Sequence, residues 1–152
     1  MNRIARAVLV LGLTMVCAFA HAELRIGYVS LKVRDLDRSL HFYDSVMKLK
    51  ESRRLKPSAD VVEVLLNGAG GNDAPGVMLM HDARRDHPYE LGDGYSRMIV
   101  YVDDLRRISD ALPESGGTTV RAITRIEALK ISILLVRDPD GYLIEFVQRD
   151  PR

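Results

Sequence analysis

Two segments of the sequence align without a gap at an offset of 69 residues: VSLKVRDLDRS from Val29 and MIVYVDDLRRI from Met98. In each segment apolar residues alternate with other types, and an aspartate, Asp35 or Asp104, then precedes an amphipathic run. Alternation with a period of two predicts a strand, and aspartate commonly caps the start of a helix. A strand–helix pair repeated at this distance predicts a duplicated architecture.

Strand-like runs follow each predicted helix. The helices carry apolar stripes at spacings of three or four residues. Pro113 is expected to close the second helix, and Gly116-Gly117 suits its exit. The stripes are Leu36, Leu40, Tyr43 and Met47 in the first helix and Leu105, Ile108 and Leu112 in the second. Strands are expected at about 50–55, 61–66, 76–81, 118–124, 130–136 and 142–148. The sequence therefore predicts an α+β fold of two βαβββ modules, at about 24–82 and 96–150, joined by a charged linker at about 83–95.

The first 22 residues have the layout of a secretory signal peptide. Arg3 and Arg6 precede an apolar stretch, and Ala20-His21-Ala22 forms an A-x-A cleavage site. A short uncleaved anchor and a lipid-modified Cys17 are the alternatives, and bulky Val16 disfavours the second. We therefore expect a periplasmic or secreted protein, a single domain over 23–152 and no membrane anchor once the signal is removed.

Charge and cysteine content exclude several classes of function. The chain has 22 basic and 21 acidic residues, so loss of Arg3 and Arg6 changes the net charge from +1 to −1. This balance gives no basic excess for nucleic-acid binding. The one cysteine would leave with the signal, so neither a disulfide nor thiol chemistry is expected in the mature chain.

Three motifs together give the chain a family resemblance. VSLKVRDLDRSLHFYDSVMKL from Val29, YELGDGY from Tyr89 and VRDPDGYLIEFVQ from Val136 resemble the vicinal oxygen chelate superfamily. That superfamily includes glyoxalase I, bleomycin-resistance proteins and extradiol dioxygenases. The resemblance implies that the eight strands form a curved sheet around an open cleft, with the helices outside. It also implies a divalent metal in the cleft, held by His or Gln, Glu, His and Glu in glyoxalase I.

The resemblance places these four ligands on the first and last strand of each module, at Tyr28, Leu79, Arg97 and Glu145. Only Glu145 keeps a suitable side chain, because leucine cannot bind a metal ion and the fixed charge of arginine repels one. We therefore expect no metal. The alternative is a displaced Zn, Ni or Fe site in which His81 joins Glu145.

Strand alternation predicts which other side chains face the cleft. Apolar neighbours, Val29, Leu31, Val33, Met98, Val100, Val102, Ile144 and Phe146, should lie beneath the strands. The predicted ligand-binding set is Tyr28, Ser30, Lys32, Leu79, Arg97, Tyr101 and Glu145. Ile99, Leu143 and Val147 should face the same way, and Glu63, Lys130 and Ser132 are further candidates whose register the alternation does not define.

Arg97 and Glu145 are expected to meet near the metal position of the family. A guanidinium can take the place of the cation and offer a planar fork to a carboxylate. The pair could be a structural salt bridge or an anchor for a ligand. In a catalytic version Glu145 is a general base and Arg97 stabilises an oxyanion, but pairing with arginine would lower the pKa of the acid and weaken it as a base.

The resulting prediction is an exported protein that binds a small anionic or oxygen-rich molecule without metal, as in the bleomycin-resistance branch. The alternative is a lyase or isomerase of the glyoxalase I type (lactoylglutathione lyase-like), with a displaced metal or none. An interaction domain that uses the charged linker is a third interpretation. The resemblance also implies a homodimer, with the cleft near its interface.

Overall fold

The computed structural model describes residues 24–71 and 74–151, so the predicted signal peptide lies outside the described residues. Module one contains β1 (Tyr28–Lys32), α1 (Leu36–Met47), β2 (Lys50–Leu55), β3 (Val61–Asn67) and β4 (Gly76–Asp82). Module two contains β5 (Met98–Tyr101), α2 (Leu105–Ser115), β6 (Thr118–Ile126), the short 3₁₀ helix η2 (Glu127–Leu129), β7 (Ile131–Arg137) and β8 (Leu143–Arg149). The predicted α+β class and the two βαβββ modules are confirmed.

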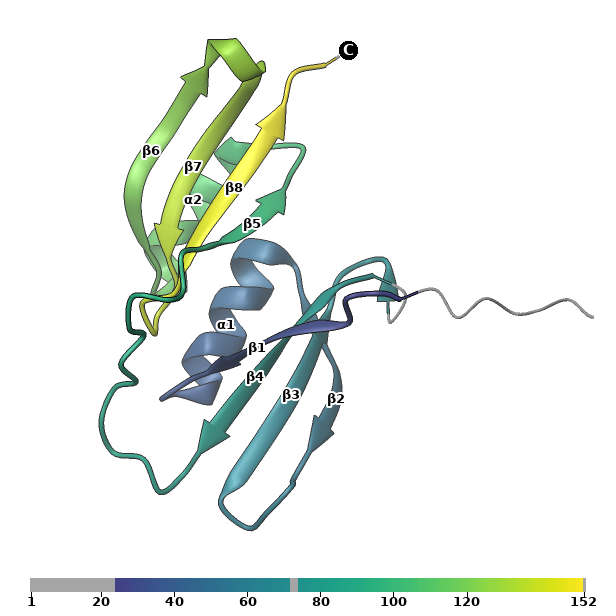
Figure 1. The fold of residues 1–152 in the computed structure, drawn as a ribbon, viewed down its shortest axis with the longest axis vertical. Helices are drawn as coiled ribbons and strands as arrows, with labels where there is room; N and C mark the ends of the chain where they lie inside the picture. Colours follow the sequence, from purple (N-terminus) through teal and green to yellow (C-terminus); the bar gives the residue numbers. More distant parts are fainter. Residues whose placement is uncertain (1–23, 72–73, 152) are drawn as a thin grey trace, which may run out of the picture.

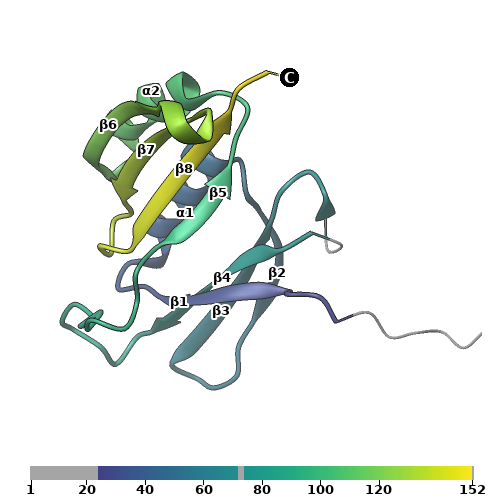
Figure 2. The ribbon, with the colours of Figure 1, turned by 45° about the horizontal axis from the view of Figure 1, so that its top comes forward.

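Each module forms its own four-stranded mixed sheet (Figures 1 and 2). The strand orders are β1-β4-β3-β2 in the first sheet and β5-β8-β7-β6 in the second. In both sheets the first strand of the module runs parallel to the last, and the other pairs are antiparallel. The strands at the predicted ligand positions are therefore neighbours within each module, and the eight strands form two sheets rather than one continuous sheet.

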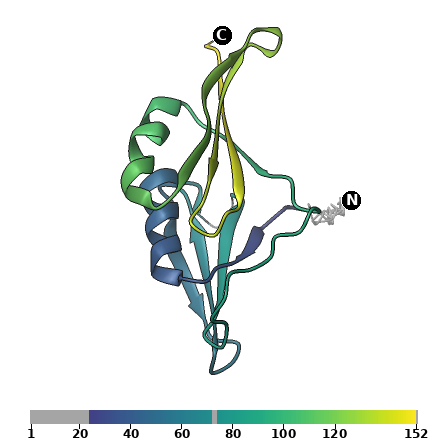
Figure 3. The same ribbon diagram turned by 90° about the vertical axis from the view of Figure 1, so that its left-hand side faces the viewer.

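The two helices lie on one side of the sheets (Figure 3) and begin at the predicted aspartate caps. A carboxylate oxygen of Asp35 accepts a hydrogen bond from the backbone N–H of Arg38 at 3.0 Å, and Asp104 caps α2 in the same way. The prediction that Pro113 closes α2 is wrong: the helix continues to Ser115 and ends at Gly116, whose φ of 80° is readily adopted only by glycine. A proline this close to the end removes only one backbone hydrogen bond.

No helix among the described residues combines the length and the apolar character needed to cross a membrane.

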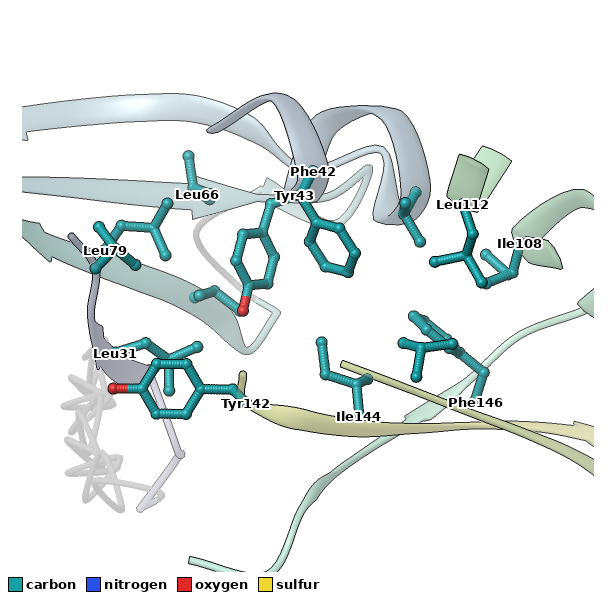
Figure 4. Packing of buried hydrophobic residues seen from close by; sticks show 14 of the residues in the cluster. Leu31, Phe42, Tyr43, Leu66, Leu79, Ile108, Leu112, Tyr142, Ile144 and Phe146 are labelled. Carbon is teal, nitrogen blue, oxygen red and sulfur yellow. The ribbon is translucent and has the colours of Figure 1, made fainter. Parts of the chain in front are cut away.

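One hydrophobic core serves both modules, and α1 is at its centre. Phe42 and Tyr43 are fully buried. Figure 4 shows their rings between Leu66 and Leu79 of the first sheet and Ile144 of β8. Because one helix buries its apolar stripe against both sheets, the two modules share a single core.

Hydrogen bonds join α1 to the turn between β7 and β8. We call this region of contact the joint. The Tyr43 hydroxyl donates to Asp138 at 2.8 Å, and the Ser39 hydroxyl donates to Asp140 at 2.8 Å. Further contacts of the joint are Arg34 N–H to Asp140, Arg38 to the carbonyl of Pro139, and the Tyr142 hydroxyl to the carbonyl of Lys32. Desolvation raises the pKa of Asp138 to about 6 despite the hydrogen bond from Tyr43. The DLDRSLHFY and DPDGYLIEF motifs therefore bind each other.

Candidate functional site

The second sheet presents an ion pair on the face opposite to the core. Arg97 directly precedes β5, and its Nε lies 2.7 Å from a carboxylate oxygen of Glu145 at the middle of β8. The Arg97 side chain is 42% exposed and that of Glu145 is 16% exposed, so the carboxylate is the better shielded partner. The predicted ion pair is present.

Strand alternation on β5 and β8 follows the prediction. Ile144 and Phe146 are fully buried in the core, whereas Ile99 and Tyr101 are 52% and 63% exposed on the opposite side. Ile99 pairs directly with Glu145. We call this side the open face; its residues are Arg97, Ile99, Tyr101, Glu145, Val147 and Arg149.

In module one the side chain of Tyr28 is held within its own sheet. Its hydroxyl donates a hydrogen bond to Asn67 at 2.9 Å, and Ser52 donates to the same amide oxygen at 2.6 Å. The ring lies against Gly76, where a Cβ atom would come within 2.7 Å of it. Tyr28 is thus bound to Asn67, and the structure does not bring it together with Arg97 or Glu145.

The predicted placement of Leu79 beside the ligand site is wrong. Leu79 pairs with Leu31 across β1 and β4, and both are buried in the core, Leu79 at 0% exposure. Ile99, which pairs with Glu145, corresponds to Ser30 through the 69-residue offset, and Ser30 pairs with Met78. Met78 is therefore the counterpart of Glu145. A shift of one residue along a strand moves a side chain to the other face, and no motif fixed the register of β4.

The remaining candidates divide between the two faces. His81 lies on the same side as Leu79, with Nδ1 3.3 Å from the Val33 carbonyl, so it is not a neighbour of Glu145. Ser132 pairs with Gln148 one residue away from the Ile133–Val147 pair and so faces the helix side. Lys130 lies outside the strands, at the end of η2. Glu63 faces the same way as Lys32, because both pair with Met80.

Val29 was predicted to lie under the helix with Leu31 and Val33. Leu31 and Val33 are buried, but Val29 is 39% exposed near the start of β1. The core does not extend to this end of the strand.

A pocket in module one gathers basic and aromatic side chains from β1 and the linker. Its volume is about 240 Å³, and Lys32, Met80, Arg85 and Tyr89 help to line it. The Arg85 guanidinium lies 4.2 Å from the centre of the Tyr89 ring, and the Lys32 ammonium lies 5.8 Å from it. Neither cation has a carboxylate partner among the described residues. Sequence reasoning missed Arg85 and Tyr89 because a linker has no periodicity that indicates side-chain direction.

The donor set does not fit the metal that the family resemblance implies. The four corresponding side chains are a phenol hydrogen-bonded to an amide (Tyr28), a thioether (Met78), a guanidinium (Arg97) and its paired carboxylate (Glu145). A catalytic Zn²⁺ site needs about three protein ligands of suitable type. Within residues 24–71 and 74–151, no three His, Cys, Asp or Glu side chains are grouped closely enough to hold an ion.

The sequence comparisons agree on one family. Residues 25–146 match the family model described as the Glyoxalase/Bleomycin resistance protein/Dioxygenase superfamily. The chain is 32% identical over 126 residues to the lactoylglutathione lyase of Haemophilus influenzae, covering 82% of this chain and 93% of that protein. It is 31% identical over 127 residues to the lactoylglutathione lyase of Neisseria meningitidis, covering 83% and 91% of the two chains.

Solved structures give the same fold. Glyoxalase I from Zea mays superposes with a TM-score of 0.74 at 25% identity, covering 84% of this chain. The match covers 45% of the maize chain, so this protein spans under half of that relative. Glyoxalase I from Leishmania major superposes with a TM-score of 0.68 at 22% identity, covering 83% of this chain and 87% of the other.

Proposed function

Because the chain belongs to the glyoxalase/bleomycin resistance protein/dioxygenase superfamily, we propose that it binds a small anionic or oxygen-rich ligand on its open face without a metal ion. The observation that carries this proposal is the ion pair of Arg97 with Glu145, 2.7 Å apart at positions where the family holds its metal. A guanidinium there supplies a fixed positive charge without coordination chemistry.

Arg97 has donors to spare for such a ligand. Glu145 engages Nε, and Nη1 makes only a long contact of 3.4 Å with the Ser96 hydroxyl. The outer N–H groups of an exposed guanidinium can bind a second oxyanion, and charge-assisted hydrogen bonds are the stronger kind. Glu145 would orient the guanidinium, while Lys32 and its pocket in module one would contribute further positive charge.

Thermal-shift and calorimetric titrations with oxalate and acetate test this proposal. Arg97→Ala should abolish the shifts, while Arg106→Ala, which removes an exposed arginine on α2, should leave them intact. Arg97→Ala should alter the stability of the free protein by less than about 1 kcal/mol, because the pair is partly exposed. Oxalate or acetate shifts that survive Arg97→Ala would overturn the assignment.

Metal analysis of the purified protein tests the metal-free part separately. Close to one equivalent of Zn, Ni or Fe per chain, lost in Glu145→Ala, would contradict it. The control is Glu114→Ala, which removes an exposed carboxylate at the far end of α2.

A glyoxalase-type lyase or isomerase is the second candidate, favoured by the two lactoylglutathione lyases that share about 30% identity over most of the chain. In this version Glu145 accepts a proton from the substrate and Arg97 stabilises the oxyanion that forms. Formation and breakdown of lactoylglutathione, with and without added Ni²⁺, measure it. Activity lost in both Glu145→Gln and Arg97→Ala would establish it, and no turnover under either condition would remove it.

We also propose export through residues 1–22, on the basis of their charged, apolar and A-x-A regions. Mass spectrometry of the protein recovered from the periplasm or the medium should show a chain beginning at Glu23. Ala20→Arg should retain the uncleaved form. A full-length chain found only in the cytoplasm would contradict the proposal.

A homodimer is proposed from the exposure of Ile99 and Tyr101 on the open face. A second copy over this face would shield the ligand from water. Sedimentation analysis should show a dimer that Ile99→Asp dissociates and that the distant Leu129→Asp leaves intact. A monomer at all concentrations would exclude it.

A further inference from the structure

At one end of the open face lies a pocket whose lining includes neither Arg97 nor Glu145. The pocket lies where β5 and β8 finish, has a volume of about 540 Å³ and is lined in part by Tyr101, Val147 and Arg149. The Arg149 guanidinium carbon lies 4.5 Å from the centre of the Tyr101 ring. A guanidinium stacked on a ring keeps its N–H edge free for a planar acceptor.

Module one contains the equivalent pocket. Tyr101 corresponds to Lys32 through the 69-residue offset, and their strand partners Val147 and Met80 also correspond. Both pockets place a cation against a tyrosine ring: Arg149 on Tyr101 here, and Arg85 on Tyr89 in module one. The duplicated fold has therefore produced the same chemistry twice from residues that are not themselves repeated.

The charges around Arg149 leave it available. Asp150 lines the pocket, but both of its oxygens are engaged by Arg125. Asp103, also in the lining, has no hydrogen bond or ion pair with any described residue. Arg149 likewise has no carboxylate partner in the part of the chain that the structure describes. Asp103 is therefore the carboxylate without a partner among the described lining residues, and its charge opposes an anion.

We propose that this pocket binds the planar carboxylate of an aromatic acid. The Arg149 edge would hold the carboxylate in two parallel hydrogen bonds, and the ligand ring would lie against Tyr101 and Val147. This inference rests on the proposed function, since the pocket continues the same open face. It makes the ligand an aromatic acid rather than any small anion.

NMR titration with benzoate, cyclohexanecarboxylate and oxalate tests the inference. Arg149→Ala should weaken benzoate binding about tenfold or more while leaving oxalate at Arg97 unchanged. Tyr101→Leu should remove the preference for benzoate over cyclohexanecarboxylate, and Tyr101→Phe should keep it. Asp103→Asn should tighten benzoate binding several-fold, because it removes the opposing charge.

The outcomes separate the two proposals. Benzoate affinity that is unchanged in Arg149→Ala, or weakened in Asp103→Asn, would overturn the aromatic-acid pocket. Oxalate binding that still depends on Arg97 would leave the proposed function standing in that case. Failure of benzoate to bind the wild-type protein would also overturn the pocket, and failure of oxalate as well would overturn both.

Discussion

The two modules have the same strand order and helix position, yet their sheets present different chemistry. In module two an ion pair lies across the first and last strands, where module one has Tyr28 bound to Asn67 and the thioether of Met78 nearby on β4. Beneath both sheets the buried side chains are mostly apolar. Because side chains alternate between the two faces of a sheet, one face can remain apolar and pack in the core while the other face carries different side chains in each module.

The helices differ in a second way. At the offset of 69 residues, two large aromatic residues of α1 correspond to smaller residues of α2. Phe42 corresponds to Ala111, and Tyr43 corresponds to Leu112. These rings fill the space between the two sheets (Figure 4), whereas α2 packs against α1 and against its own sheet. Both modules therefore supply buried residues to the shared core, and module two supplies the charged site.

The largest expected effect concerns the register of β4. Leu79→Glu should destabilise the protein by more than about 4 kcal/mol, because it buries an unpaired carboxylate in the core. Met78→Glu, one position away, should cost only about 1 kcal/mol, because it points to the open side of the sheet. Urea denaturation measures both. Equal costs would contradict the assignment of Met78 as the counterpart of Glu145.

The contrast between the helices predicts the next effect. Tyr43→Ala should cost about 3–5 kcal/mol, since it leaves a cavity between two sheets. Tyr43→Phe should cost about 1–2 kcal/mol, because it removes only the hydrogen bond to Asp138. Leu112→Ala in α2 is the matched variant and should cost less than Tyr43→Ala. The opposite order in thermal denaturation would reverse the roles given to the two helices.

Because Asp138 of the joint is buried, we expect the free energy of unfolding to depend on pH. The pKa of Asp138 is raised to about 6 by burial, from an ordinary value of 3.8. The folded protein therefore holds this proton more tightly than the unfolded chain. The stabilisation is complete below about pH 3.8 and is lost as the pH rises through 6, up to about 3 kcal/mol in the free energy of unfolding.

Asp138→Asn should flatten this part of the stability profile, because the amide resembles the protonated acid. The carboxylate of Asp140 faces the same site and raises the pKa of Asp138 further. The hydroxyl of Tyr43 and the backbone N–H of Tyr142 lower this pKa. Asp93→Asn in the linker is the control and should leave the profile unchanged. The predicted direction would be refuted if the free energy of unfolding of the wild-type protein rose between pH 4 and 6 and Asp138→Asn removed that rise.

The smallest expected effect tests the symmetry of the two modules. Arg38 donates to the carbonyl of Pro139, and Arg107, its counterpart at an offset of 69, donates to the carbonyl of Val46. Each arginine thus reaches the other module. Arg38→Ala and Arg107→Ala should each cost about 1 kcal/mol, against less than about 0.5 kcal/mol for Arg106→Ala. A neutral result for either one would show that the crossing contacts are not equivalent.

The sequence predicted the repeated modules because they depend on strong local patterns, and the family resemblance predicted the ion pair by placing Arg97 and Glu145 at neighbouring positions. Asp35 and Asp104 marked the helix starts, and alternation around Glu145 placed Ile144 and Phe146 in the core. The site on β4 could not be placed in the same way. GVMLMH is apolar on both faces, so its pattern does not distinguish Met78 from Leu79.

Side chains of the linker and of the joint were also beyond sequence reasoning. Arg85 and Tyr89 form their pocket through a loop whose path follows no period. The DPDG turn was expected only to connect two strands, since nothing in its residues indicates a partner in α1 about a hundred positions earlier.

This separation in sequence has a consequence for the order in which the molecule is assembled. Synthesis of α1 is finished long before the turn that binds it, because Tyr43 and Asp138 are 95 positions apart. Until β8 is made, the helix can cover the first sheet but leaves its other side in contact with water. Contacts this distant form slowly, since a long loop must close before they stabilise anything. β8 therefore completes the interior of the first module as well as its own.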